Sequence, residues 1–183
     1  MVLTAQTFEE FALAHPDQQW ELHGGKLREK PGGSFDHNDA MCQLGFRLMD
    51  LVDRKTFGVR VNAGYLRHDA GNYYIPDVFV FPQALAEPLR HRFDVLEVYR
   101  DALPLVVEVW SPSTGGYDID EKLPLYFARG DLEIWRIQPD ERSLIAWRRQ
   151  ADGSYAKTEY RGGVVPVSSL AGVVIDLDAL FDW

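Results

Sequence analysis

One segment has the apolar pattern of a strand that is buried on both faces. Leu105–Val109 runs Leu-Val-Val-Glu-Val, between Pro104 and the dipeptide Ser111-Pro112. A short apolar, β-branched run with such boundaries is typical of a strand at the centre of a sheet that helices cover. Glu108 interrupts the run, and a buried carboxylate without a partner is costly. We therefore expect Glu108 to meet the surface, a cation or a metal ion.

Three segments show helical spacing or helix boundary signals. The first segment, residues 4–14, has Thr4 or Thr7 as a possible N-cap. In the second, which begins at Asp36 or Asn38, apolar residues recur at intervals of three and four. In the third, Pro124 is compatible with a helix only near its first turn, which we place near Asp120. The pattern predicts helices over residues 4–14, from Asp36 or Asn38 to about Lys55 with Gly58 as terminator, and over residues 118–129. The inward face of the second helix is expected to consist of Met41, Leu44, Leu48, Leu51 and Val52.

The remaining apolar segments predict further strands, several of them joined by glycine-containing turns. One of these, residues 73–81, is mostly apolar and contains a single acid, Asp77. The other expected strands cover residues 20–22 and 26–29 as a hairpin, 59–63, 132–137, 144–148 and 155–160 as a second hairpin, 164–165 and 173–177.

Length and composition favour one α/β domain over residues 1–183, with a central mixed sheet flanked by helices. The single cysteine, Cys42, excludes an internal disulfide, and its helical surroundings favour a small core residue. No apolar run approaches the ~20 residues of a membrane helix, and no signal peptide is visible, so we expect a cytoplasmic protein. The formal net charge of −9 argues against tight, non-specific binding to nucleic acid but leaves room for a local basic cleft.

Asp77 and Glu108 are each the only acid in an apolar strand, and pairing of those strands would bring the two carboxylates together. Like charges that close are stabilised by a cation between them, and Mg²⁺ binds such oxygen ligands. Lys122 follows in the next helix, where it can point back at the same place. It would then activate a water molecule or stabilise charge on a phosphate.

The order of strand with Pro-Asp, strand with Glu, and nearby Lys resembles the PD-(D/E)XK nuclease superfamily. The resemblance is closer to its Uma-type branch, described as restriction endonucleases, and covers nearly the whole chain. The matching motifs are Trp20-Glu21-Leu22-His23-Gly24-Gly25-Lys26-Leu27, His37, Ile75-Pro76-Asp77-Val78, Leu105-Val106-Val107-Glu108-Val109, Ser111-Pro112-Ser113-Thr114, Asp118 with Lys122-Leu123-Pro124-Leu125-Tyr126, and Glu133-Ile134-Trp135.

The resemblance implies a restriction-endonuclease-like fold and a Mg²⁺-dependent site, with Mn²⁺ as a substitute, that hydrolyses DNA. Asp77 and Glu108 would bind the metal, the carbonyl group of Val109 could add a ligand, and Lys122 would position the attacking water. Glu21 would belong to the catalytic group and bind or orient a second ion. The resemblance also assigns substrate contacts to His37 and Tyr126, and it implies a homodimer, since a duplex has two strands to cut.

One position departs from the superfamily pattern. The usual lysine lies two residues after the glutamate on the same strand, where this chain has Trp110. The Uma-type branch resembles this chain in having the lysine on the helix, so Lys122 is taken as its substitute. If Lys122 faced solvent instead, the catalytic interpretation would weaken sharply.

Plainer roles remain open for every candidate residue. They are a turn acid for Asp77, an ion pair with Arg129 or Arg136 for Glu108, a solvated helix lysine for Lys122, an exposed hairpin residue for Glu21, a helix-start residue for His37, a core residue for Tyr126, and a helix cap or lysine partner for Asp118. Two other functions also remain: a non-catalytic binding or assembly module of the nuclease fold, and a hydrolase with two carboxylates such as a glycosidase.

Overall fold

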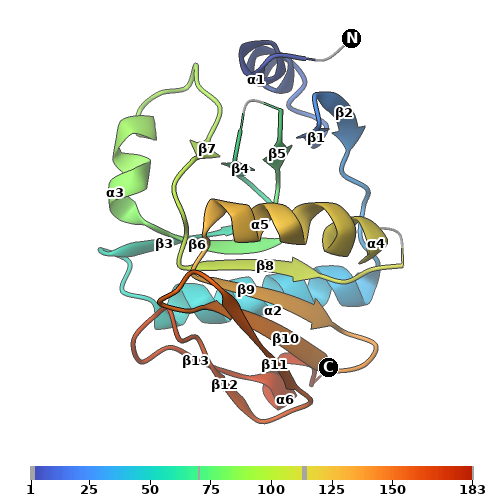
Figure 1. Ribbon diagram of the computed structural model, residues 1–183, viewed down its shortest axis with the longest axis vertical. Coiled ribbons are helices and arrows are strands. Elements are labelled where there is room, and N and C mark those ends of the chain that lie inside the picture. Colours follow the sequence, from blue (N-terminus) through green and yellow to red (C-terminus); the bar gives the residue numbers. More distant parts are fainter. Residues whose placement is uncertain (1–2, 70, 113–114, 183) are drawn as a thin grey trace.

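A six-stranded mixed sheet forms the centre of the protein (Figure 1). The computed structural model describes residues 3–69, 71–112 and 115–182. The strand order is β11-β10-β9-β8-β6-β3, in which β8 and β9 are parallel and every other pair is antiparallel. The strands are β3 (Phe57–Val61), β6 (Val78–Pro82), β8 (Leu105–Val109), β9 (Glu133–Gln138), β10 (Ser143–Arg149) and β11 (Tyr155–Tyr160). The fully buried strand β8 thus lies inside the sheet, as its apolar sequence predicts.

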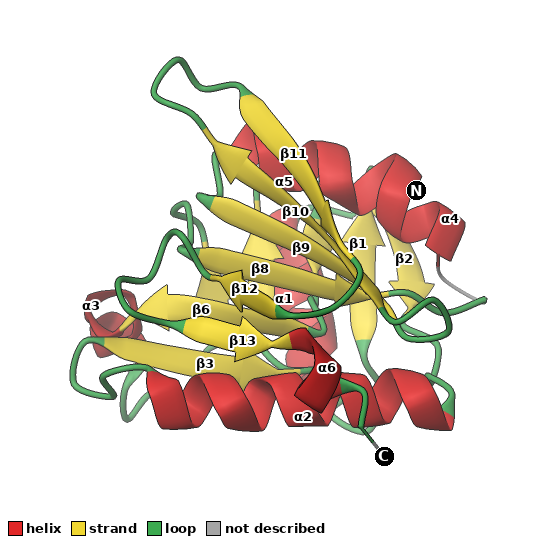
Figure 2. Ribbon diagram, turned by 90° about the horizontal axis from the view of Figure 1, so that it is seen from below, coloured by secondary structure: helices red, strands yellow, loops and turns green. Residues whose placement is uncertain are grey.

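Helices cover both faces of this sheet. Figure 2 shows α2 (Phe35–Leu51) along one face and α5 (Leu123–Arg129) along the other. This arrangement confirms the predicted mixed sheet with flanking helices. The shorter helical segments are α3 (Gln83–Ala86), η1 (Glu87–Leu89), α4 (Gly115–Tyr117), η2 (Asp118–Lys122) and α6 (Leu177–Leu180).

A second, five-stranded sheet lies at the upper end of the molecule in Figure 1, next to α1 (Ala5–Ala14). Its order is β2-β1-β5-β4-β7, and Phe8 of α1 packs in the same buried cluster as Leu22 and Tyr73. The strands are β1 (Trp20–His23), β2 (Lys26–Glu29), β4 (Tyr65–Arg67), β5 (Tyr73–Tyr74) and β7 (Val98–Tyr99). A separate pair, β12 (Val164–Pro166) and β13 (Val174–Asp176), precedes α6.

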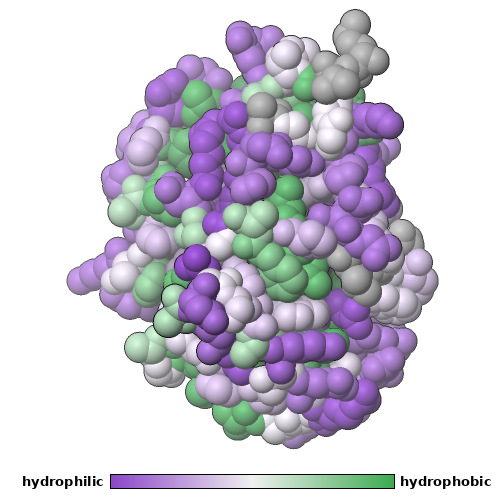
Figure 3. Space-filling view, viewed as in Figure 1, coloured by the Kyte–Doolittle hydropathy of each residue, from purple (hydrophilic) through white to green (hydrophobic). Residues whose placement is uncertain are grey.

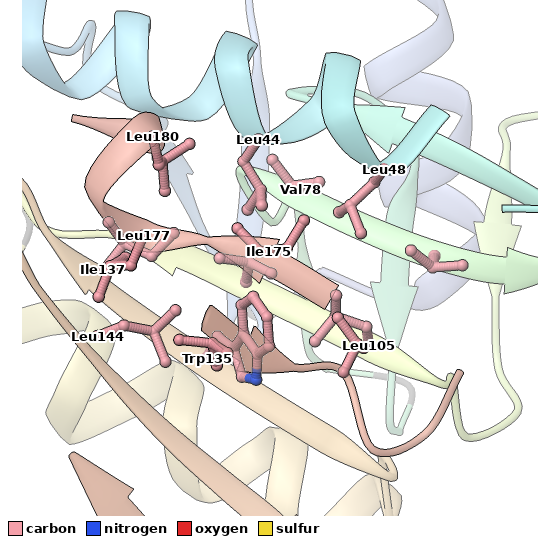
Figure 4. Close-up of a cluster of buried hydrophobic side chains, with 14 of the residues drawn as sticks. Leu44, Leu48, Val78, Leu105, Trp135, Ile137, Leu144, Ile175, Leu177 and Leu180 are labelled. Carbon is pink, nitrogen blue, oxygen red and sulfur yellow. The ribbon is translucent and has the colours of Figure 1, made fainter. Parts of the chain in front are cut away.

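The main core fills the space between α2 and the large sheet (Figure 4). Leu44 and Leu48 of α2 belong to the same cluster as Val78 of β6 and Trp135 of β9, and all four are fully buried. The same cluster takes in Leu105, Ile137, Leu144, Ile175, Leu177 and Leu180. This packing holds β6 and β8 rigidly side by side, which fixes the ends of both strands.

The predicted end of the long helix was wrong. Helix α2 ends at Leu51, which is 45% exposed, and not near Lys55. Asp53 stops it by accepting hydrogen bonds from the backbone N–H of Lys55 and the hydroxyl of Thr56, which forms a tight turn. Gly58 belongs to β3 and terminates no helix.

Cys42 is exposed, so the expectation of a core residue was also wrong. It lies on the outward face of α2, whereas the neighbouring Met41 and Leu44 face the sheet.

No helix in the described ranges combines the length and apolar character needed to cross a bilayer. Figure 3 shows that the face carrying α5 is mostly hydrophilic, with hydrophobic residues gathered near its centre.

The predicted strand over residues 73–81 is divided between the two sheets. Tyr73–Tyr74 is β5 of the small sheet, and Val78–Pro82 is β6 of the large one. Pro76 has no N–H to donate to a ladder and holds the preceding residue in an extended conformation. Asp77 therefore stands at the junction of the two sheets, directly before β6.

The helix after β8 starts earlier than predicted. Segments α4, η2 and α5 follow one another from Gly115 to Arg129, and η2 is a π-helix in which the N–H of Leu123 bonds to the carbonyl of Asp118. This wider turn lies directly before Pro124, which disturbs an α-helical ladder. Lys122 is the last residue of the π segment.

Candidate active site

Asp77 and Glu108 come together at one edge of the large sheet. Val78 pairs with Val107 in the antiparallel β6–β8 ladder, so the residues before Val78 and after Val107 are neighbours. The backbone N–H of Val109 donates to Oδ2 of Asp77 over 2.8 Å. Asp77 is 2% exposed and Glu108 is 5% exposed. The pairing predicted from two isolated acids is therefore present.

Lys122 points into the same place and does not face solvent. Its side chain is 3% exposed, and its Nζ lies 3.0 Å from Oε1 of Glu21, 3.3 Å from Oε1 of Glu108 and 3.5 Å from Oδ1 of Asp118. Burial acts to lower the pKa of Lys122, but these carboxylates outweigh it and raise the pKa well above its usual value. Lys122 is therefore a buried cation, and Asp118 is one of its partners.

Glu21 is buried at 1% exposure, so its alternative as an exposed hairpin residue is excluded. Strand β1 carries it from the small sheet toward the end of β8. Its Oε1 contacts Lys122 and also accepts the backbone N–H of Ile75 over 2.9 Å. Glu21 thus connects the small sheet to the pocket at the edge of the large one.

Tyr126 and His37 each touch one of the two central acids. The Tyr126 hydroxyl donates to Oε1 of Glu108 over 2.5 Å, one helical turn beyond Lys122. His37, in the first turn of α2, has its Nε2 3.2 Å from Oδ2 of Asp77. Gly33 gives it room, because a Cβ there would come within 2.2 Å of the His37 ring. His37 lines the pocket that holds these acids, whereas Tyr126 lies behind Glu108 and does not line it.

Lys30 is the site residue that sequence reasoning missed. It follows β2, and its Nζ donates to Oδ1 of Asp77 over 2.9 Å. No pattern in the sequence distinguishes it from a solvated lysine beside an edge strand. The proposed pairs of Glu108 with arginine are not formed: Arg129 binds Asp131, and Arg136 binds Gln138.

The two central acids differ in their electrostatic environment. Burial acts to raise the pKa of Asp77, but the Lys30 ammonium group and the His37 hydrogen bond outweigh it and hold the pKa below its usual value. For Glu108, burial dominates and raises the pKa well above its usual value, although Lys122 opposes this. The surroundings of Asp77 therefore favour its ionised form. Around Glu108, the nearby positive charge does not offset the cost of burying the ionised form.

The acids line a small pocket with a cavity volume of about 10 Å³, which is the space of about one water molecule. Its lining includes Glu21, Lys30, His37, Asp77, Glu108 and Lys122. Arg28 of β2 lies beside it, with its guanidinium carbon 3.5 Å from the ring centre of the pocket residue Tyr117. The motif residues Ser113 and Thr114 lie outside the described part of the chain.

The residues present fit a hard divalent cation in chemistry and in charge. Their donors are carboxylate oxygens, the ligands that Mg²⁺ prefers. Four buried carboxylates and two buried ammonium groups leave the pocket with a formal charge of −2 when His37 is neutral. Within the described residues, no three His, Cys, Asp or Glu side chains already surround one point as ligands. Lys122 lies among three of the carboxylates, so metal binding requires Glu108 to turn away from it.

Comparisons with known proteins show the fold and the family of the chain. The crystal structure of a "putative nuclease belonging to DUF820" from Anabaena variabilis ATCC 29413 superposes with a TM-score of 0.78. The alignment covers 99% of this chain and 98% of that one at 18% sequence identity, so it shows the shared fold. The search of curated proteins found no match. Residues 5–178 match the sequence profile of the Uma2 family, described as "Putative restriction endonuclease". The chain therefore belongs to the Uma2 family.

Proposed function

We propose that the protein is a Mg²⁺-dependent endonuclease that hydrolyses DNA phosphodiester bonds, with Mn²⁺ able to replace Mg²⁺. The observation that carries the proposal is the convergence of Glu21, Asp77, Glu108 and Lys122 from four separate segments in one buried pocket. Membership of a family described as a restriction endonuclease supports nuclease chemistry.

Asp77, Glu108 and the backbone carbonyl of Val109 would hold the ion. When bound, it would act as a Lewis acid toward the phosphate and lower the pKa of a bound water. The pocket is suited to this because its formal charge of −2 is balanced by one divalent cation. Without the ion, the ionised form of the buried Glu108 carboxyl group is costly, because too little positive charge lies near it.

Lys122 would position and help to activate the attacking water. Its ammonium group is oriented by Glu21, which in turn is fixed by the backbone of Ile75. The Tyr126 hydroxyl donates to Glu108, which would turn away from Lys122 to bind the ion, and His37 would orient Asp77. At the pocket mouth, the guanidinium group of Arg28 is available to a phosphate of the DNA backbone.

A plasmid-nicking assay tests this function. Purified protein should nick supercoiled DNA with Mg²⁺ or Mn²⁺ and lose activity with EDTA. Asp77→Asn and Lys122→Met should lower the rate by at least about 10²-fold, the scale of lost acid–base or electrostatic catalysis. Lys26→Met changes an exposed lysine of β2 and is the matched control, which should leave the rate unchanged. Equal nicking by all four proteins would identify a contaminating nuclease and refute the assignment.

Cleavage of both strands of a duplex also leads us to propose a homodimer. Sedimentation velocity at micromolar protein should give a mass near twice the 20.9 kDa of the chain. A monomer with full nicking activity would contradict the dimer and leave the chemistry intact.

The alternative is a non-catalytic module that uses the nuclease fold for binding or assembly. The observation that favours it is the closed network of ion pairs, in which Lys30 and Lys122 already neutralise part of the acid cluster. Calorimetric titration with Mg²⁺ separates the two functions. Millimolar or tighter binding that disappears in Glu108→Gln supports the enzyme, and no heat of binding supports the module.

A further inference from the structure

Lys30 occupies a built cation site inside the candidate active site. Its side chain is 9% exposed. The Nζ donates to Oδ1 of Asp77 over 2.9 Å, to Oδ1 of Asn62 over 2.8 Å and to the carbonyl oxygen of Ile75 over 2.9 Å. An ammonium group has three hydrogens to donate, so these contacts satisfy it completely.

The three acceptors are a carboxylate, a side-chain amide and a backbone carbonyl. These are the oxygen types that hard divalent cations take as ligands. Each comes from a different place: Asn62 follows β3, Ile75 lies between the two sheets, and Asp77 precedes β6. Three oxygen atoms of the types that bind divalent cations thus surround the ammonium group of Lys30.

We propose that Lys30 takes the place of a second divalent ion at Asp77, so that the pocket binds one metal ion per chain. This rests on the proposed function, in which Asp77 and Glu108 hold that ion. With both lysines in place, all four carboxylates ionised and His37 neutral, the pocket has a formal charge of −2, which one divalent cation neutralises. A second would leave a buried charge of +2 among these side chains, which low-polarity surroundings disfavour.

Lys30 therefore acts as a positioning residue. It fixes one oxygen of Asp77, while the N–H of Val109 and the ring of His37 engage the other. Removing its charge while keeping its shape should open the oxygen site to a metal ion. Lys30→Met does this, because methionine is an apolar chain of similar length.

Counting bound Mn²⁺ by electron paramagnetic resonance during a titration of the full chain tests the proposal without any activity measurement. Wild type and the control Lys26→Met should bind one Mn²⁺ per chain, and Lys30→Met should bind two. Lys30→Arg retains the charge and should stay at one.

Two ions in wild type, or one in a folded Lys30→Met chain, would overturn the proposal and leave a metal-dependent nuclease standing. No bound ion in wild type would refute the proposed function itself. If Lys30→Met unfolds without metal, millimolar Mn²⁺ should restore its circular dichroism spectrum, because a divalent ion replaces the missing ammonium group. Failure of that rescue also counts against the proposal.

Discussion

Replacing Lys122 by methionine should destabilise the protein strongly when no divalent ion is present. Methionine retains the apolar part of the side chain and removes the ammonium group. That group lies within 3.0–3.5 Å of carboxylate oxygens from three residues, whose side chains are 1–7% exposed: Glu21, Glu108 and Asp118. Removing one partner from a buried ion pair typically costs ~3–5 kcal/mol, because the remaining charge stays buried.

A loss of this size should be measurable by thermal and urea unfolding. For a domain of this length each kcal/mol shifts the melting temperature by roughly 2–4 °C, so the expected decrease is roughly 6–20 °C. Circular dichroism in EDTA would follow the unfolding of wild type, Lys122→Met and the exposed control Lys26→Met. The control should stay within about 0.5 kcal/mol of wild type.

The double variant Lys122→Met/Glu108→Gln adds a second readout. Glu108→Gln removes one of the buried carboxylates that lose their counter-ion in Lys122→Met. The double variant should therefore be more stable than Lys122→Met alone. Such coupling is expected between residues in one network. A Lys122→Met chain within about 1 kcal/mol of wild type in EDTA would refute the reasoning, since Lys122 would then not be the counter-ion of the acid cluster.

Three further predictions address the fold and the pocket mouth. Arg129→Met removes a fully buried guanidinium group that joins the two sheets, and should cost ~3–5 kcal/mol in urea unfolding while leaving the nicking rate of folded protein unchanged. Gly58→Ala places a Cβ 2.2 Å from the Phe81 ring and should cost ~1–3 kcal/mol, with Phe81→Leu restoring part of the stability; an additive loss in the double variant would contradict this. Arg28→Ala, beside Tyr117, should weaken DNA binding and reduce its salt slope by about one, as measured by fluorescence anisotropy; an unchanged slope would exclude a phosphate contact.

The central pair of acids could be predicted because each one breaks an apolar pattern. Asp77 and Glu108 stand out in segments that otherwise have the composition of buried strands, and adjacent strands of that kind pair. Lys122 could be predicted from its place on the helix that follows β8. The direction of its side chain could not, since Lys122 lies in a π-helical segment, Asp118–Lys122, and not in the α-helix expected there.

The assembly of the small sheet was beyond prediction, although its hairpin β1–β2 was predicted and β5 lies within the predicted strand over residues 73–81. Strands β4, β5 and β7 are two or three residues long, too short for an alternating pattern to appear. Their pairing depends on contacts between distant segments, such as Tyr65 with Val98. Lys30 was missed for the same reason, because its partners Asn62 and Asp77 lie more than 30 residues away in sequence.

The backbone N–H and carbonyl of Ile75 link both halves of the pocket, and they are available because Ile75 lies between β5 and β6. Its N–H binds Glu21 in the group around Lys122, and its carbonyl binds Lys30 in the group around Asp77. In a continuous strand both groups would belong to a β-ladder. The proline that follows Ile75 interrupts the strand, since it has no N–H to donate to a ladder. The Pro-Asp motif therefore does more than supply an acid: its proline ends the strand next to Ile75, whose N–H fixes Glu21, a partner of Lys122, and whose carbonyl accepts from Lys30.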